Sequence, residues 1–306
     1  MKHRMVQYGL WPTCNNSCAF CLRKNREVWN KQQMLEAIDM TCKNIDYVDW
    51  ENEFSDGISI LGGEIYFITD KELQDAYMGL IDKIIDKILL VSKSEHCRYS
   101  TVTNGMYDPA FLYKVIDRIK EKTGGMQFVD VNFSYDLKYR YPNDEKRLLA
   151  LQNAREFAKR YDYRPGIQTI LTQYIIEDIL YKGYDFNKFL NEDIAGCNFC
   201  FLYPHPISTG KKLNDFFFKR EDFIKFCIYI KSTYQEIWYN MYRSTHNSGI
   251  YKYTGLIDKT YETITQQPVL SDGKEELTEC GHSILYRCYS DSNNCMLCDL
   301  EAIGEE

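Results

Sequence analysis

Hydrophobic positions along the first two-thirds of the chain follow two alternating patterns. Short apolar runs of the kind found in buried strands alternate with longer segments whose apolar residues recur every three or four positions, as in amphipathic helices. The clearest helical segment carries Leu73, Tyr77, Leu80, Ile81, Ile84, Ile85 and Ile88 on one face. The pattern predicts strands at 5–11, 57–61, 99–105, 128–136, 166–173 and 199–204, and helices at 30–44, 73–88, 108–122, 144–160 and 185–191.

Six strands that alternate with helices predict a parallel sheet with right-handed crossovers. For 306 residues we expect an α/β fold, an open, partial (β/α)6 TIM-like barrel with a small cysteine-rich C-terminal module. The expected domains are the barrel at 1–215, a helical connector at 216–262 and the cysteine-rich module at 263–306. In the connector, the aromatic-rich stretch 220–242 reads as one long helix.

Polar or glycine-rich segments follow the first five predicted strands. They are a three-cysteine loop after the first strand, then "LGGE", "VTNG", "FSYD" and "ILTQ". In parallel α/β sheets, ligands bind at the carboxyl ends of the strands. These segments should therefore meet at one edge of the sheet and form the functional site.

Composition narrows the class of protein. Hydrophobic residues make up 44% and charged residues 26% of the chain, as in ordinary globular proteins. The net charge of −7 argues against general nucleic-acid binding, which needs a basic surface. No apolar run is long enough for a membrane span, and the N-terminus lacks the apolar core of a signal peptide, so a cytoplasmic location is expected.

Twelve cysteines in a cytoplasmic chain indicate metal binding more than disulfides. Three of them, Cys42, Cys97 and Cys227, stand alone in apolar or helical stretches and are expected in the core. Cys14, Cys18 and Cys21 lie within eight residues. Structural zinc takes four ligands, whereas three thiolates on a [4Fe–4S] cluster leave one iron open to an exogenous ligand.

The spacing of Cys14, Cys18, Phe20 and Cys21 resembles the C-x3-C-x-aromatic-C loop of the radical S-adenosylmethionine (SAM) superfamily. Gly62-Gly63-Glu64 stands after the second predicted strand, where that family carries a GGE motif, and "TVTNG" ends the third. The resemblance covers about residues 6–207. It implies that SAM chelates the open iron and is cleaved reductively to a 5′-deoxyadenosyl radical, which abstracts a hydrogen atom from the substrate.

The resemblance also implies roles for the motif residues. Phe20 would pack beside the cluster and face the adenine, and Gly62 and Gly63 would let the backbone approach the methionine moiety. Glu64 could pair with the SAM ammonium, or the backbone around it could accept from that group. Ile65 replaces the usual proline after this motif.

Further cofactor-binding candidates share a position at or just after a strand end. They are Asn104, Ser134, Asp136, Thr172, Gln173 and Leu202, with Tyr203 beside the last. Each has an equally ordinary reading as a turn or cap residue.

A second cysteine group lies near the C-terminus. Cys280, Cys288, Cys295 and Cys298 amount to a complete coordination sphere, and the group resembles the SPASM or twitch auxiliary-cluster module of radical SAM enzymes, with Asn293 at a position usually held by glycine. A second [4Fe–4S] cluster is the preferred interpretation, and a structural zinc site is the alternative. Cys197 and Cys200 either are structural or join Cys295 and Cys298 in a split site.

The substrate is the least determined feature. By analogy with auxiliary-cluster enzymes, a peptide or protein side chain is expected, together with an electron donor such as flavodoxin or ferredoxin. The alternatives are modification of a nucleotide or nucleic-acid base and, in another class, a non-catalytic iron–sulfur electron carrier. An open cluster site argues against the carrier, which would favour four protein ligands. His205, past the sixth strand, is a further candidate near the substrate, and an ordinary loop residue is the favoured alternative reading.

Overall fold

The computed structural model describes residues 5–18, 28–46, 57–91, 97–136, 140–203, 217–247, 289 and 296–305. Several predicted site residues lie outside the described ranges: Phe20, Cys21, Cys280, Cys288 and Cys295, and with them His205.

A six-stranded sheet organises the first two-thirds of the chain, in the order β1-β2-β3-β4-β5-β6 with every neighbouring pair parallel. The strands are β1 (Met5–Gly9), β2 (Gly57–Leu61), β3 (Arg98–Thr103), β4 (Val129–Tyr135), β5 (Gly166–Ile170) and β6 (Asn198–Leu202). The sequential order, with β1 and β6 at the edges, is that of the predicted partial barrel.

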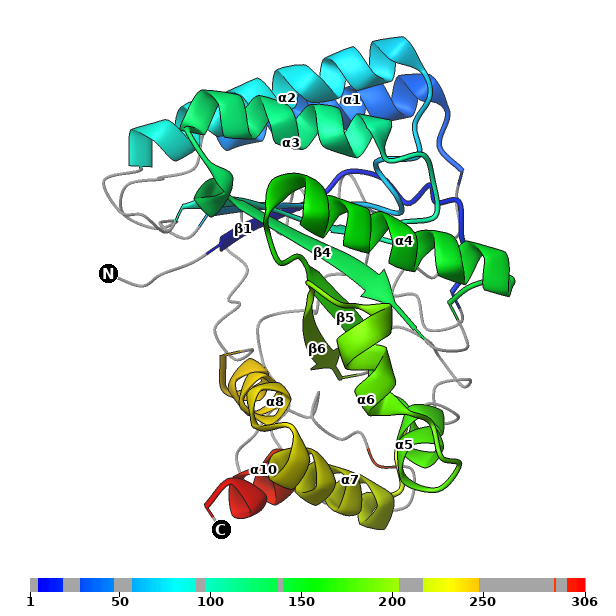
Figure 1. The fold of residues 1–306 in the computed structure, drawn as a ribbon. Helices are drawn as coiled ribbons and strands as arrows, with labels where there is room; N and C mark the ends of the chain where they lie inside the picture. The colour runs from blue at the N-terminus through cyan, green and yellow to red at the C-terminus, as the bar shows by residue number, and fades with distance from the viewer. Residues whose placement is uncertain are drawn as a thin grey trace.

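Helices connect successive strands, and α1 to α4 lie together over the sheet in Figure 1. The crossover helices are α1 (Lys31–Ile45), α2 (Lys71–Val91), α3 (Ala110–Thr123), α4 (Asp144–Tyr161) and α5 (Gln173–Leu180), with η1 (Met126–Phe128), α6 (Phe186–Lys188) and the π-helical turn η2 (Phe189–Asp193). The α1 helix begins with a capping box between Asn30 and Gln33, which satisfies backbone donors at both residues.

The two faces of the sheet differ in chemistry. Tyr99 of β3 contacts Tyr77 of α2 through their hydroxyls at 2.8 Å, and the Phe133 ring of β4 packs against Phe157 of α4. These residues define the face under the helices, and along β4 the residues on this face are buried while the alternate ones are half-buried. The opposite face, which we call the inner face, carries Ser100, Asp130, Asn132, Ser134, Gln168 and Cys200. A parallel sheet usually has two apolar faces, so this polar row marks a face that is suited to contact polar ligands.

The stretch expected as one long helix at 220–242 forms two helices, and that expectation was wrong. The α7 helix (Arg220–Thr233) ends at Tyr234, whose backbone (φ −134°, ψ 69°) is not helical, and α8 (Gln235–Asn247) follows. The ring of Tyr234 packs edge-on against Phe186, 5.2 Å between centroids. Because no glycine or proline stands at the break, the hydrophobic spacing gave no sign of it.

The C-terminal helix α10 (Met296–Glu305) packs against α7 and α8 beyond β6, as Figure 1 shows. Asp299 of α10 accepts both the Nε and Nη2 donors of Arg220, at 2.9 and 2.6 Å, and the hydroxyl of Tyr289 at 2.7 Å. The expected boundary between a connector and a separate C-terminal module stays a prediction. Among the described residues, no helix has both the length and the apolar character needed to cross a bilayer.

Candidate functional site

The chain leading into the cysteine loop is paired with the glycine loop after β2. The backbone N–H of Gly63 donates to the carbonyl of Trp11 at 2.7 Å, and that of Glu64 donates to the carbonyl of Thr13 at 3.0 Å. A Cβ atom added to Gly63 would lie 2.1 Å from the Thr13 carbonyl oxygen. Glycine at this position is therefore required for the close approach that joins the two loops.

Gly62 and Ile65 complete this turn. Ile65 is buried, 1% exposed, and a Cβ atom at Gly62 would lie 2.7 Å from its Cγ1. The isoleucine that stands in the proline position of the motif therefore fills the space under Gly62 and anchors the turn in the core.

Glu64 is buried, and its carboxylate binds the protein itself. Oε1 accepts the Thr103 hydroxyl at 2.9 Å and the Tyr66 backbone N–H at 3.2 Å, and Oε2 accepts the Asn104 backbone N–H at 2.6 Å. Burial raises the pKa of Glu64 to about 7, while the hydrogen bonds from Asn104, Tyr66 and Thr103 act in the opposite direction. The side chain thus joins the loop after β2 to the carboxyl end of β3.

Asn104, directly after β3, contacts the cysteine loop with its side chain. Its Nδ2 donates to Asn15 Oδ1 at 2.7 Å and lies 3.7 Å from the sulfur of Cys14, while its Oδ1 accepts the Met106 N–H at 2.9 Å. Asn15 in turn donates to the carbonyl of Met106 at 3.0 Å. The first part of the cysteine loop is therefore held at the end of β3 through two asparagine side chains.

Cys18 is held by a segment that follows β4. Asn16 Nδ2 donates to the Cys18 sulfur at 3.1 Å and to the carbonyl of Arg140 at 2.6 Å, and Arg140 Nη1 lies 3.7 Å from the same sulfur. Both Cys14 and Cys18 are half-buried. The loop is thus fixed between the carboxyl ends of β3 and β4 by contacts on either side of its cysteines.

The residues present fit an iron–sulfur cluster bound through thiolates. Cysteine thiolates are the usual ligands of such clusters, and N–H donors to their sulfurs are a usual part of the surroundings. Asn104, Asn16 and Arg140 supply such donors to Cys14 and Cys18. Cys21, the third expected ligand, lies outside the described residues. Within the described ranges, no three cysteine, histidine or acidic residues gather as a metal site.

Ser134 and Asp136 lie at the end of β4, as expected. Ser134 is half-buried on the inner face, and its carbonyl accepts the Tyr141 hydroxyl at 3.1 Å. Asp136 is fully buried directly after the strand. Both residues therefore stand at the end of the strand that precedes Arg140, whose guanidinium lies near the sulfur of Cys18.

Thr172 and Gln173 were expected to end β5, but the strand ends at Ile170 and they begin α5 instead, Thr172 at the N-cap position. Thr172 is fully buried, and its hydroxyl has no hydrogen-bond partner in the described part of the chain. A buried hydroxyl without a partner is costly, so Thr172 is suited to contact a bound ligand. Leu202 is the last residue of β6, and its carbonyl accepts the Leu171 N–H at 2.7 Å.

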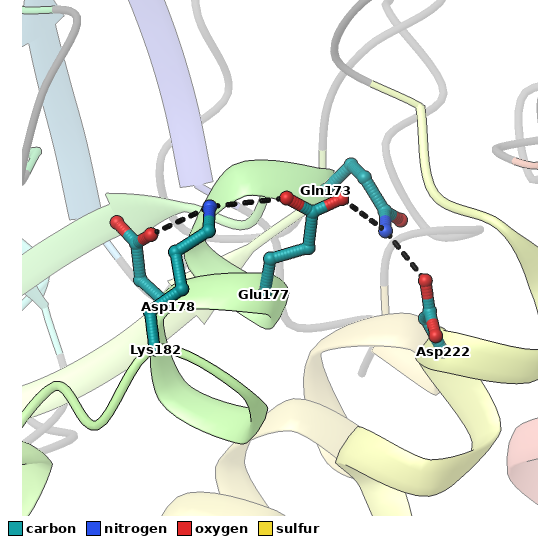
Figure 2. A network of polar contacts seen from close by, with 5 residues as sticks. All are labelled: Gln173, Glu177, Asp178, Lys182 and Asp222. Atoms are coloured by element: carbon teal, nitrogen blue, oxygen red, sulfur yellow. Dashed lines mark hydrogen bonds and ion pairs between the residues drawn. The ribbon is translucent and has the colours of Figure 1, made fainter.

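Gln173 bonds within its own helix and to the start of α7 rather than facing an open site. Figure 2 shows its amide between Glu177 and Asp222: Nε2 donates to Asp222 at 2.7 Å and to Glu177 at 3.2 Å. Its Oε1 accepts the Lys219 backbone N–H at 2.8 Å. Lys182 extends the network through an ion pair with Glu177. The observed role of Gln173 is to clasp α5 to the start of α7.

Sequence reasoning missed the side chains that surround the cysteines. Asn15 and Asn16 stand between Cys14 and Cys18, so their position next to expected ligands was an available signal. Arg140 gave no local signal, because it reaches the loop across 122 residues. The inner-face polar residues Asp130 and Asn132 could have been found from the alternation in "VDVNFSY" of β4.

The other described cysteines lie outside the cysteine loop and differ in burial. Cys97 and Cys227 are fully buried, as expected for core residues, and Cys42 is half-buried in α1. Burial raises the pKa values of Cys197 and Cys200 to about 11. Cys298 is half-buried on α10, and with its three predicted partners outside the described residues, the C-terminal site stays a prediction.

No protein-family model matches the chain, and no curated protein matches it in sequence. Solved structures that resemble it include native anSMEcpe with bound AdoMet (TM-score 0.47, 16% identity, 77% of this chain and 62% of that one) and a hexahistidine-tagged form of anSMEcpe with bound AdoMet (0.49, 16%, 78% and 62%). Streptococcus suis SuiB bound to precursor peptide SuiA also resembles it (0.44, 15%, 76% and 47%). The chain spans less than two-thirds of the length of these proteins.

Proposed function

We propose that this protein is a radical SAM enzyme, of the oxidoreductase or transferase type, in which Cys14, Cys18 and Cys21 hold a [4Fe–4S] cluster. The observation that carries the proposal is the convergence of the cysteine loop, the Gly63 loop and Asn104 at the carboxyl ends of β1, β2 and β3. Two sequence motifs far apart in the chain are thereby joined by direct backbone pairing, in the region where parallel sheets bind ligands.

When bound, the cluster would supply one electron for cleavage of SAM to methionine and a 5′-deoxyadenosyl radical, which takes a hydrogen atom from the substrate. The protein's own residues bind and orient. Because the Glu64 carboxylate is buried and bonded to Thr103 and Asn104, we assign the SAM ammonium to backbone carbonyls of the glycine loop rather than to this side chain. Ser134 of β4 and Thr172 at the N-cap of α5 are the proposed polar contacts.

The polar inner face supports a polar substrate. Asp130 accepts the Ser100 hydroxyl at 3.0 Å and the Asn132 amide at 3.1 Å on the inner face. We propose a peptide or protein side chain as the substrate, on the basis of the C-terminal cysteine group, with flavodoxin or ferredoxin as electron donor in the cytoplasm. A gene for a short precursor peptide beside this one would support the assignment, and nucleotide-metabolism neighbours would favour the alternative of nucleotide modification.

The test is anaerobic reconstitution with iron and sulfide, followed by dithionite and SAM. The wild type is expected to yield 5′-deoxyadenosine, measured by liquid chromatography, and Cys18→Ala is expected to yield none. Cys42→Ala is the matched control, because Cys42 is half-buried in α1 and should leave the yield unchanged. Full product formation by Cys18→Ala would contradict the ligand assignment.

Metal analysis of the same samples tests the C-terminal group. Two clusters require about eight irons per chain, because each holds four. One cluster with a structural zinc gives about four irons and one zinc. The Cys280→Ala variant should lower only the second metal content, whichever metal it is.

A further inference from the structure

Two N–H donors from separate parts of the chain meet at the sulfur of Cys18. Asn16 Nδ2 lies 3.1 Å from it and Arg140 Nη1 lies 3.7 Å from it. The Asn16 amide also donates to the Arg140 carbonyl at 2.6 Å. Because an amide nitrogen carries two N–H groups, Asn16 can direct one to the sulfur while the other holds the backbone of Arg140 in place.

The surroundings of Cys14 differ. Its sulfur lies 3.7 Å from Asn104 Nδ2 and 3.8 Å from Asn15 Oδ1, two neutral amide groups. The contact that Arg140 makes brings a permanent positive charge to Cys18. A bound cluster would therefore meet a guanidinium beside Cys18 and two amide groups beside Cys14.

Hydrogen bonds to cluster sulfurs and nearby charge are two of the factors that set the reduction potential of iron–sulfur clusters. One-electron reduction adds a negative charge to the cluster. An N–H donor or a guanidinium beside a ligand sulfur stabilises the reduced form more than the oxidised form, because the interaction grows with the negative charge on sulfur.

We propose that Asn16 and Arg140 act together as positioning residues that raise the reduction potential of the cluster bound through Cys18, an inference that rests on the proposed function. Reduction by a low-potential one-electron donor would thereby become more favourable. The reduction potential would then also depend on the position of Arg140. Arg140 follows β4, the strand whose inner-face residues Asp130, Asn132 and Ser134 are suited to contact a ligand.

The experiment is a redox titration of the full chain, reconstituted anaerobically and without SAM, followed by the electron paramagnetic resonance signal of the reduced cluster. Asn16→Ala and Arg140→Gln are each expected to lower the ratio of reduced to oxidised cluster at a fixed potential about tenfold, which is about 59 mV for one electron. Arg140→Lys, which keeps the charge, should fall between Arg140→Gln and the wild type.

Two matched controls make the same substitutions elsewhere. Asn191→Ala removes an exposed amide that donates to Asn187, and Arg118→Gln removes a guanidinium paired with Asp82 on the helical side. Both should titrate as the wild type does.

The possible outcomes distinguish failure of the proposed function from failure of the inference about Asn16 and Arg140. A wild type that binds no reducible cluster would contradict the proposed function itself. A wild type that titrates normally, with an unchanged midpoint in whichever of Asn16→Ala and Arg140→Gln loads iron, overturns this inference alone. Failure of both variants to load, while the two controls load fully, overturns it as well, because the side chains would then hold the loop without tuning it.

Discussion

The carboxylate of Glu64 accepts the backbone N–H of Asn104 at 2.6 Å inside the protein, where Glu64 is 1% exposed. This contact crosses from the loop after β2 to the end of β3. The sequence suggested Glu64, the acidic residue of the glycine motif, as a partner for a cofactor amine. In this structure its carboxylate links the loop after β2 to the end of β3.

The first prediction concerns the pH dependence of stability. The folded pKa of Glu64, about 7, lies above its ordinary value of 4.5, so between these values the folded protein binds more protons than the unfolded chain. This residue's contribution therefore makes the free energy of unfolding fall as pH rises from about 4.5 to about 7, by about 3 kcal/mol in total. Urea unfolding of the metal-free protein across this range measures the slope.

Glu64→Gln is the comparison variant. Its amide nitrogen would face a backbone N–H, so the variant should be less stable than the wild type, but its stability should depend less on pH between these values. An equal slope in both proteins would show that Glu64 does not titrate in this range.

The second prediction concerns the close approach at Gly63. A methyl group there would sit 2.1 Å from the Thr13 carbonyl oxygen, which is backbone and cannot turn away. We expect Gly63→Ala to destabilise the protein by about 3 kcal/mol, the upper end of ordinary overpacking costs, and to reduce iron loading.

Gly79→Ala is its matched control. Gly79 lies inside α2, and a Cβ atom there would have no neighbour within 4 Å. Alanine should stabilise this helix by roughly 0.5–1 kcal/mol. Thermal unfolding of both variants checks the pair, and a Gly63→Ala protein as stable as the wild type would exclude the tight pairing of the two loops.

The third prediction separates a structural role of Gln173 from cofactor binding. Gln173→Glu would place a carboxylate beside Asp222 and Glu177, which the present amide bridges. We expect a loss of about 2 kcal/mol at pH 8, since an amide donor is replaced by a like charge. The introduced carboxyl should have a raised pKa, so stability should recover toward the wild-type value at pH 5.

The control is Gln152→Glu. Gln152 donates to Glu156 on the exposed face of α4 at 2.8 Å, where solvent screens the added charge, and should lose less than about 1 kcal/mol. Denaturant unfolding at the two pH values measures both variants. If Gln173→Glu weakened SAM binding while leaving stability untouched, the clasp between α5 and α7 would not be its main role.

The fourth prediction concerns the attachment of the C-terminal helix. Asp299 is 11% exposed at its side chain and binds Arg220 through two oxygens. Asp299→Asn should cost about 2 kcal/mol, less than a fully buried pair because Arg220 is partly exposed. Tyr289→Phe, which removes one hydrogen bond to Asp299, should cost about 1 kcal/mol.

The same substitution at an exposed pair provides the reference. Asp39 pairs with Lys43 on α1, and both side chains are more than half exposed, so Asp39→Asn should change stability by less than about 1 kcal/mol. Thermal unfolding followed by circular dichroism compares them. Equal effects of Asp299→Asn and Asp39→Asn would mean that the Arg220 pair does not secure α10.

The local pattern of hydrophobic residues was sufficient to predict the six-stranded sheet and its strand order. The strand at 57–61 was found with its bounds, because an apolar run set between charged residues and a glycine turn has few other readings. The meeting of the cysteine loop with Gly63 and Asn104 followed from strand parallelism alone. The first of these two expectations uses only the local sequence pattern, and the second uses only the parallel topology of the sheet.

The features that the sequence did not predict depend on contacts between side chains that lie far apart in the chain. The Glu64 carboxylate binds Thr103 and Asn104, which lie 39 and 40 residues further along the chain, and Arg140 lies beside Cys18 across a separation of 122 residues. The break at Tyr234 likewise depends on a ring from another element. No spacing along the chain carries such information.

The pairing of Gly63 with Thr13 also has a mechanical meaning. Two backbone hydrogen bonds join the residues that precede Cys14 to the turn after β2, and there is no room for a side chain between them. These two segments are therefore rigidly coupled. A displacement of either segment would therefore also displace the other, and with it the surroundings of Cys14 and of Glu64.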